Sequence, residues 1–111
     1  MIDSTNRKYA IIWFDSIATK AKRLTAGNCS HKAASIRGEA MRSRIFILVH
    51  GHKEDKLLNK MCTRFERIEK YCEVITPSNV QKKKERIWTY ATWCKWLLSM
   101  HQFEDDHHSI L

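Results

Sequence analysis

The sequence predicts an α/β domain, in which a small, mostly parallel three-stranded sheet is covered by helices in the order β-α-α-β-α-β-α. Two observations support this fold class. Residues 9–14 and 45–49 are short apolar runs rich in β-branched and aromatic side chains, which is typical of buried strands. Segments with helical spacing separate these runs, and helices between strands indicate parallel pairing. The alternative is a mostly α-helical protein with two short strands.

Four helical segments are predicted from apolar spacing and from residues that favour helix ends. Asp15 or the serine after it is expected to cap the first segment, and Gly27 to end it. The third segment has the clearest pattern, because its apolar residues recur every three or four positions. Thr76-Pro77 is typical of a helix start, and residues 73–76 are expected to form the third strand. No internal repeat is apparent. The helices are expected over residues 17–24, 32–42, 54–71 and 78–101.

The 111 residues are expected to form a single domain, 1–111, with loose ends over residues 1–7 and 104–111. Hydrophobic residues make up 43% of the chain, which is enough for a core without disulfide or metal support. The apolar run at 10–14 is too short for a signal peptide, and no run has transmembrane length. We therefore expect a cytoplasmic or nuclear protein, not a secreted one, whose four cysteines stay reduced.

The charge excess indicates a polyanionic partner. Twenty basic residues against 12 acidic ones give a formal net charge of +8, which favours DNA or RNA. The excess is concentrated in residues 17–44, with seven Lys or Arg and one Glu, and in the last predicted helix. An acidic protein surface is the alternative partner, and no membrane partner is expected. The residues expected to contact nucleic acid are Lys20, Lys22, Arg23, Lys32, Arg37, Arg42, Lys82, Lys83 and Lys84.

Two histidines follow the second predicted strand, at the sheet edge where α/β proteins bind ligands. His50 and His52 would share one face of an extended chain, as in the His-hydrophobic-His motif of single-strand DNA nickases. In that motif a metal assists a tyrosine nucleophile, which here would be Tyr90 or Tyr71. Gly51 replaces the bulky middle residue, however, and no third ligand is evident. A surface turn with two ordinary histidines is the preferred interpretation.

Residues 44–79 have a local resemblance to two families. Val49-His50-Gly51-His52, followed by an amphipathic helix and a short strand, is similar to the opening of nucleotide-binding TIR-like domains. The same residues resemble the strand–His–Gly turn of α/β-hydrolases. The hydrolase G-x-S-x-G motif does not occur, and the chain is too short for that fold. Neither family is assigned.

The cysteines and histidines do not form a metal motif. No C-x-x-C pair is present, and the remaining ligand types are scattered rather than paired. Cys62, Cys72 and Cys94 fall on apolar stripes and are expected to be core residues. No metal and no other cofactor is predicted. The residues considered for zinc are Cys29, His31, His50, His52, His107 and His108.

The last predicted helix is apolar over more than half of its circumference. A surface helix of a monomer needs a narrower stripe, so part of this one is expected to pack on a partner. Tryptophan is enriched in interfaces, and we expect a homodimer through Trp93, Trp96 and Met100. A central core helix is one alternative. Stacking of nucleic-acid bases on Trp88 or Trp96 is the other.

Together these features predict a small basic nucleic-acid-binding protein with a regulatory or accessory role and no catalytic activity. One alternative is an enzyme that acts on phosphoesters or nucleotides at the strand tips around His50 and His52. Another is a small inhibitor or interaction protein whose basic face docks on an acidic protein surface.

Overall fold

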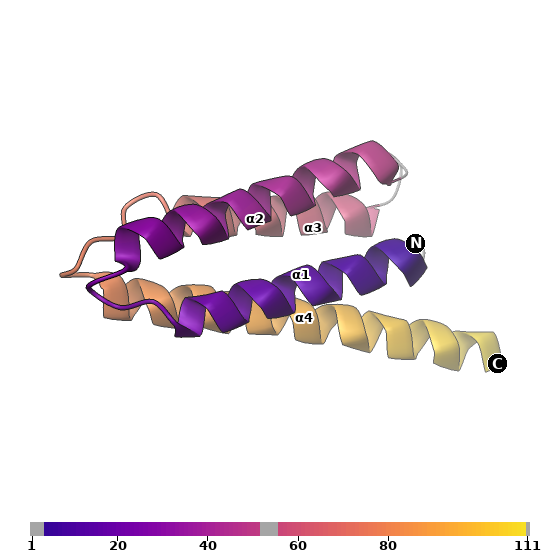
Figure 1. Ribbon diagram of the computed structural model, residues 1–111. Coiled ribbons are helices and arrows are strands. Elements are labelled where there is room, and N and C mark those ends of the chain that lie inside the picture. Colours follow the sequence, from indigo (N-terminus) through magenta and orange to yellow (C-terminus); the bar gives the residue numbers. More distant parts are fainter. Residues whose placement is uncertain (1–3, 52–55, 111) are drawn as a thin grey trace.

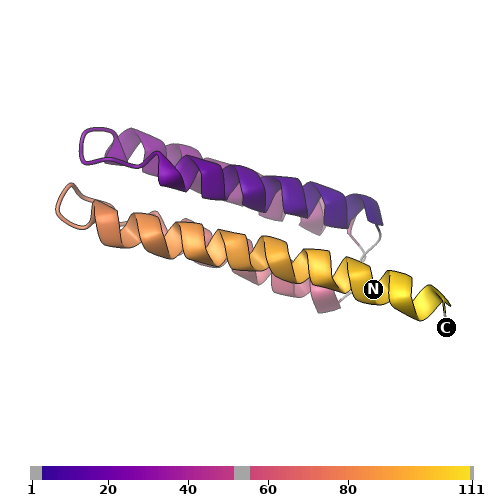
Figure 2. The ribbon, with the colours of Figure 1, turned by 90° about the horizontal axis from the view of Figure 1, so that it is seen from below.

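The protein folds as a four-helix bundle. In the computed structural model, which describes residues 4–51 and 56–110, the helices are α1 (Ser4–Lys22), α2 (Cys29–His50), α3 (Lys56–Tyr71) and α4 (Val80–Ile110). Helices that follow one another in the chain run in opposite directions (Figure 1). α1 packs mainly on α4 and α2 mainly on α3, while the α1–α2 and α3–α4 contacts close the bundle (Figure 2). No helix in the described ranges has both the length and the apolar character needed to cross a bilayer.

The predicted α/β fold is wrong, because no strand occurs within the described residues. The mostly helical alternative is closer, although both of its strands are also helical. The predicted helices at 54–71 and 78–101 are confirmed as α3 and α4, with Glu54 and Asp55 lying outside the described residues. Residues 73–76, expected as a strand, belong to the α3–α4 connection.

The run at 9–14 is helical because it continues a buried stripe. Ala10 and Phe14 precede Ile17 and Ala21 at spacings of four, three and four residues, and all four side chains are fully buried. Asp15, expected as a helix cap, therefore lies in the middle of α1. The helix propensities of isoleucine, tryptophan and phenylalanine are only a few tenths of a kcal/mol below that of leucine. Tertiary packing of the stripe outweighs so small a preference.

The run at 45–49 is helical for the same reason. Ile36, Ala40, Ser43 and Ile47 form one buried row along α2, so the helix continues through the apolar run to His50. The predicted end at residue 42 was wrong, because Ser43 is polar and hides the continuity of the row. Its hydroxyl is satisfied inside the helix by donating a hydrogen bond to the Glu39 carbonyl (2.8 Å).

The two helical hairpins have matching loops. The Asn28 side chain accepts a hydrogen bond from the Thr25 backbone N–H (2.8 Å) and donates one to the Arg23 carbonyl (2.9 Å). Asn79 does the same with the Thr76 N–H (2.8 Å) and the Val74 carbonyl (2.8 Å). Each asparagine directly precedes the helix that follows the loop. The expected start at Ser78 is therefore replaced by a start at Val80.

These loops belong to an internal repeat, contrary to the sequence prediction that there is none. Asn79 follows Asn28 by 51 residues, and the same offset relates the buried positions of the two hairpins. The offset makes α1 equivalent to α3 and α2 equivalent to α4, and the packing agrees, since α1 packs mainly on α4 and α3 mainly on α2. The buried equivalent pairs are Ala10/Met61, Phe14/Phe65, Ile17/Ile68, Ala21/Cys72, Cys29/Val80, Ile36/Ile87, Ala40/Ala91, Ser43/Cys94 and Ile47/Leu98.

A pair of stacked phenylalanines occupies the centre of the repeat. Phe14 and Phe65 are equivalent residues, and their rings lie parallel (2°) with centroids 4.1 Å apart. Both side chains are fully buried. The ion pairs at the bundle edges follow the repeat only in part. Arg44 pairs with Glu69 (2.8 Å) and the equivalent Lys95 pairs with Asp15 (2.7 Å), but the two acidic partners are not at equivalent positions.

Replacing either ring should destabilise the bundle strongly. Phe14→Ala and Phe65→Ala are each expected to lower the free energy of unfolding by about 3–5 kcal/mol, because each leaves a cavity. The double variant should cost less than the sum by about 0.5–1.5 kcal/mol, since either single change already removes the attraction between the rings. Urea denaturation followed by circular dichroism measures both quantities. Ile12→Ala, at an exposed position of α1, is the control. Additive losses would show that the rings do not stabilise one another.

Candidate functional site

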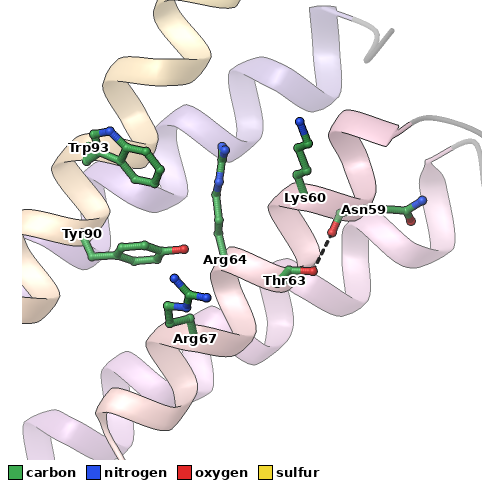
Figure 3. A pocket seen from close by; sticks show the side chains of 7 residues that line it. All are labelled: Asn59, Lys60, Thr63, Arg64, Arg67, Tyr90 and Trp93. Carbon is green, nitrogen blue, oxygen red and sulfur yellow. Dashed lines mark hydrogen bonds between the residues drawn. The ribbon is translucent and has the colours of Figure 1, made fainter.

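A groove between α3 and α4 is lined by cations and aromatic rings. Its central hollow has a volume of about 320 Å³. An adjoining hollow towards the loop end shares Tyr90 and Trp93 with it. Figure 3 shows the two rings of α4 facing the arginines of α3. The central hollow is lined by Asn59, Lys60, Thr63, Arg64, Arg67, Tyr90 and Trp93, and the adjoining one adds Tyr71, Lys82, Glu85, Arg86 and Thr89.

Arginines and rings alternate along this groove. The Arg64 guanidinium lies 5.1 Å from the centre of the Trp93 ring, and that of Arg67 lies 5.7 Å from the centre of the Tyr90 ring. Both distances are within the range of cation–π attraction. Tyr90 also contacts Trp93, with ring centroids 5.8 Å apart. These contacts hold the guanidinium groups at the groove wall without neutralising their charge.

Arg64 has an unsatisfied donor in the groove. Its Nη1 atom is buried and has no hydrogen-bond partner among the described residues. A buried donor without an acceptor costs about 1–3 kcal/mol, and more when the group is charged. No carboxylate from the described part of the chain lines the central hollow, where Lys60 and Arg67 add two further cations. An anion placed there would balance the charge, and it would become the acceptor for Nη1 once the Arg64 side chain turned towards it.

The repeat provides a second groove for comparison, between α1 and α2. Trp13 lines it at the position equivalent to Arg64, and Arg42 lines it at the position equivalent to Trp93. The ring is therefore on the first helix of this hairpin and the guanidinium on the second, the reverse of the α3–α4 groove. Lys20 and Glu39, which form an ion pair, replace the rings of Tyr71 and Tyr90. This groove has about 380 Å³ and carries an internal acid–base pair. The excess of unpaired cations is therefore a property of the α3–α4 groove.

The basic residues predicted to bind nucleic acid do not form one surface. Lys20 and Arg42 meet in the α1–α2 groove, whereas Lys22 lies 5.1 Å from the Trp88 ring on the α1–α4 side. Arg37 makes a long ion pair with Glu73 of the loop after α3 (3.9 Å). The others lie at separate places: Arg23 and Lys32 beside the first loop, Lys82 in the α3–α4 groove, and Lys83 and Lys84 half-buried in the first turn of α4.

The catalytic candidates are not brought together. His50 is the last residue of α2, where its ring lies 4.3 Å from that of Phe46, and His52 lies outside the described residues. Tyr90 is on α4, diagonally across the bundle from α2. Burial raises the pKa of Tyr90 to about 12, so the phenol stays protonated and is a poor nucleophile at neutral pH. The strand-tip site has no strand to support it in the described ranges.

All four cysteines are free and buried. Among the described residues, no three side chains of the types that ligate metals come together. Burial raises the pKa of Cys72 to about 12 and that of Cys94 to about 11, so these thiols stay protonated at neutral pH. Of the other zinc candidates, His31 is exposed on α2, and the side chains of His107 and His108 lie outside the described part.

The three residues predicted for a dimer interface are exposed. Trp93, Trp96 and Met100 lie on the outer side of α4, away from its buried row. Trp93 also belongs to the α3–α4 groove. The homodimer itself stays a prediction.

Comparisons with protein-family models, curated proteins and solved structures found no match to this chain.

Sequence analysis missed Lys60, Arg64 and Arg67. They lie in a segment whose charge is almost balanced, since residues 45–77 hold six basic and five acidic residues. The spacing contains the missing signal. Lys60, Arg64 and Arg67 recur at helical intervals on the α4 side of α3, whereas Glu66 and Glu69 lie near Arg44 on the α2 side.

High pH should destabilise the protein. Burial raises the pKa of the Cys72 and Cys94 thiols from an ordinary value of 9.0 to about 12 and about 11. The folded state therefore holds these protons more tightly than the unfolded state does. Its stabilisation is complete below about pH 9 and is lost as the pH rises through 11 to 12. Urea midpoints between pH 8 and 11 should fall, and should fall less steeply for the Cys72→Ala, Cys94→Ala double variant. Equal slopes would contradict this origin.

Trp96→Glu should leave the fold intact, because Trp96 is 56% exposed. If the α4 face forms the predicted homodimer, this variant should sediment as a monomer where the wild type sediments as a dimer. Ile12→Glu, on the exposed side of α1, is the matched control. A wild-type protein that stays monomeric at high micromolar concentration would contradict the dimer.

Proposed function

We propose that this protein binds single-stranded nucleic acid along the α3–α4 groove, in a regulatory or accessory role and without catalysis. The observation that carries the proposal is a hollow lined by Lys60, Arg64 and Arg67 without a carboxylate from the described residues, where Arg64 also has a buried Nη1 with no acceptor. Phosphate oxygens are strong acceptors and suit guanidinium groups particularly well. The net charge of +8 would attract the same ligand from a distance.

The rings favour a single strand over a duplex. Tyr90 and Trp93 lie beside the cations, which is the combination that single-strand binding sites use for bases and phosphates. A duplex keeps its bases stacked on one another and offers only phosphates to such a groove. The two hollows follow one another along the helices, which suits an extended strand better than an enclosed small molecule.

The α1–α2 groove is the reason to propose one site rather than a diffuse basic surface. Glu39 neutralises Lys20 there, and no ring pair is present at the positions of Tyr71 and Tyr90. Docking on an acidic protein surface is the second candidate function. The net charge supports it, but the aromatic content of the α3–α4 groove does not require it.

Removing the two guanidinium groups should weaken binding. The Arg64→Gln, Arg67→Gln variant should bind a labelled single-stranded oligonucleotide at least tenfold more weakly than the wild type. Its salt dependence should be flatter by about 0.7 logarithmic units for each phosphate that the variant no longer neutralises. Fluorescence anisotropy over a salt series measures both, with single-stranded DNA, single-stranded RNA, a duplex of equal length and polyglutamate as ligands.

A control variant that loses the same charge elsewhere shows whether the loss of oligonucleotide affinity is specific to the α3–α4 groove. Arg23→Gln, Arg42→Gln removes the same charge from the first loop and the α1–α2 groove, and should leave affinity nearly unchanged. Equal losses in both variants would mean that charge is used diffusely and would overturn the groove. Polyglutamate that binds as tightly as the oligonucleotide would favour the protein-docking alternative.

A further inference from the structure

The outer face of α2 carries an apolar row whose large side chains are about half exposed. Ala34, Gly38, Met41, Ile45 and Leu48 follow one another at spacings of four, three, four and three residues. We call these five residues the α2 seam. Met41, Ile45 and Leu48 are 43%, 47% and 53% exposed. Alternating steps of three and four residues are the heptad spacing by which one helix receives another.

The fold does not require this row. The bundle builds α4 at the equivalent positions from Glu85, Thr89, Thr92, Trp96 and Ser99, of which only Trp96 is apolar. The buried rows of α2 and α4 nevertheless agree, as with Ile36/Ile87 and Ala40/Ala91. Since the equivalent core is formed under a mainly polar outer face in α4, this core does not require apolar side chains at the positions of the α2 seam. An exposed apolar row of this length marks an interaction surface.

The size of the side chains indicates a helix as the occupant. Ala34 and Gly38 at one end are small, and a second backbone could approach closely there once the Arg42 guanidinium, 3.1 Å from the position of a Cβ on Gly38, moved aside. Met41, Ile45 and Leu48 at the other end are large and would fit between side chains of the incoming helix. An extended peptide would repeat its side chains every two residues and would match this row poorly.

The charges beside the seam select an acidic partner. Glu39 is the single acidic residue of α2, and its ion pair with Lys20 occupies it. Arg44 is also occupied, by Glu69 of α3. Arg37 and Arg42 remain exposed, one on each side of the seam, and the ion pair of Arg37 with Glu73 is a long one. Charges at such flanking positions determine which helices pair.

A second copy of this chain fits the seam poorly. Two α2 helices packed antiparallel about Ile45 would bring Arg42 of both copies into one interface. Like charges across an interface oppose association.

We infer that the α2 seam binds one helix of an acidic partner protein, an amphipathic helix with apolar residues at heptad spacing and Glu or Asp beside them. The bound helix would become the fifth helix of the assembly. This surface lies on α2 and does not include the α3–α4 groove, so it is independent of the proposed nucleic-acid site.

Two designed helical peptides test the inference on the intact protein. Both carry leucine at the heptad core positions, and they differ only in having Glu or Lys at the flanking positions. Each is labelled and used below the concentration at which it associates with itself. Fluorescence anisotropy should show the Glu peptide binding at least tenfold more tightly than the Lys peptide.

The variant Met41→Thr, Leu48→Ser gives the α2 seam the residues that α4 carries at the equivalent positions. It should reduce Glu-peptide binding about tenfold or more and leave the thermal unfolding midpoint unchanged. Trp96→Thr, which removes the one apolar side chain from the equivalent row of α4, should leave peptide binding intact. Arg64→Gln, Arg67→Gln should also leave it intact, which separates this surface from the nucleic-acid groove.

Three results would overturn the inference: equal binding of the two peptides, absence of binding to the Glu peptide, or unchanged binding by the Met41→Thr, Leu48→Ser variant. Sedimentation of the Met41→Thr, Leu48→Ser variant could give a further result that overturns the inference. If the wild type self-associates and this variant does not, a second copy occupies the seam instead of an acidic helix.

Discussion

The parallel stack of Phe14 on Phe65 is the contact on which the bundle depends. Both rings are fully buried, and they come from equivalent positions of the two hairpins. Each hairpin alone has a one-sided apolar surface that it cannot cover. The stack joins those surfaces inside the bundle, and the buried rows of both hairpins continue from it in one core. Ile17, Ile68 and the buried alanines follow from the same alignment.

The bundle is symmetric inside and asymmetric outside, and this contrast directs attention to its functional surfaces. Most of the buried pairs at the 51-residue offset are similar in size and polarity, because both hairpins must fit one core, and Ala10/Met61 is the clearest exception. The grooves are not under that constraint. One has the Lys20–Glu39 ion pair where the other has Tyr71 and Tyr90, and the second keeps an unsatisfied arginine. Differences between otherwise equivalent positions are where selection for something other than folding can act.

Charge is distributed by the same logic. Basic residues on the faces between helices are paired where an acidic residue lies opposite, as with Arg44 and Glu69 or Lys95 and Asp15. In the α3–α4 groove most of the cations meet rings instead, and beside the α2 seam Arg37 and Arg42 are largely free of close acidic partners among the described residues. The two surfaces therefore combine positive charge with different apolar side chains: aromatic rings in the α3–α4 groove and aliphatic side chains along the α2 seam. Cations beside rings suit nucleobases and phosphates, whereas cations beside aliphatic side chains suit an acidic amphipathic helix.

The sequence by itself determined the third and fourth helices, the burial of Cys62, Cys72 and Cys94, and the excess of positive charge. Those features depend on spacing within one segment, which a single chain displays directly. Tertiary structure decided the rest. Residues 9–14 and 45–49 have side chains suited to strands, and only the continuation of a buried row through Phe14 and Ile47 makes them helical. The α3–α4 groove could not be predicted either, because Arg64 and Tyr90 are 26 positions apart and meet only when α3 packs on α4. Local side-chain preferences amount to a few tenths of a kcal/mol per residue, whereas burying one large side chain contributes about 1.5–3 kcal/mol, so packing across the bundle prevails wherever the two disagree.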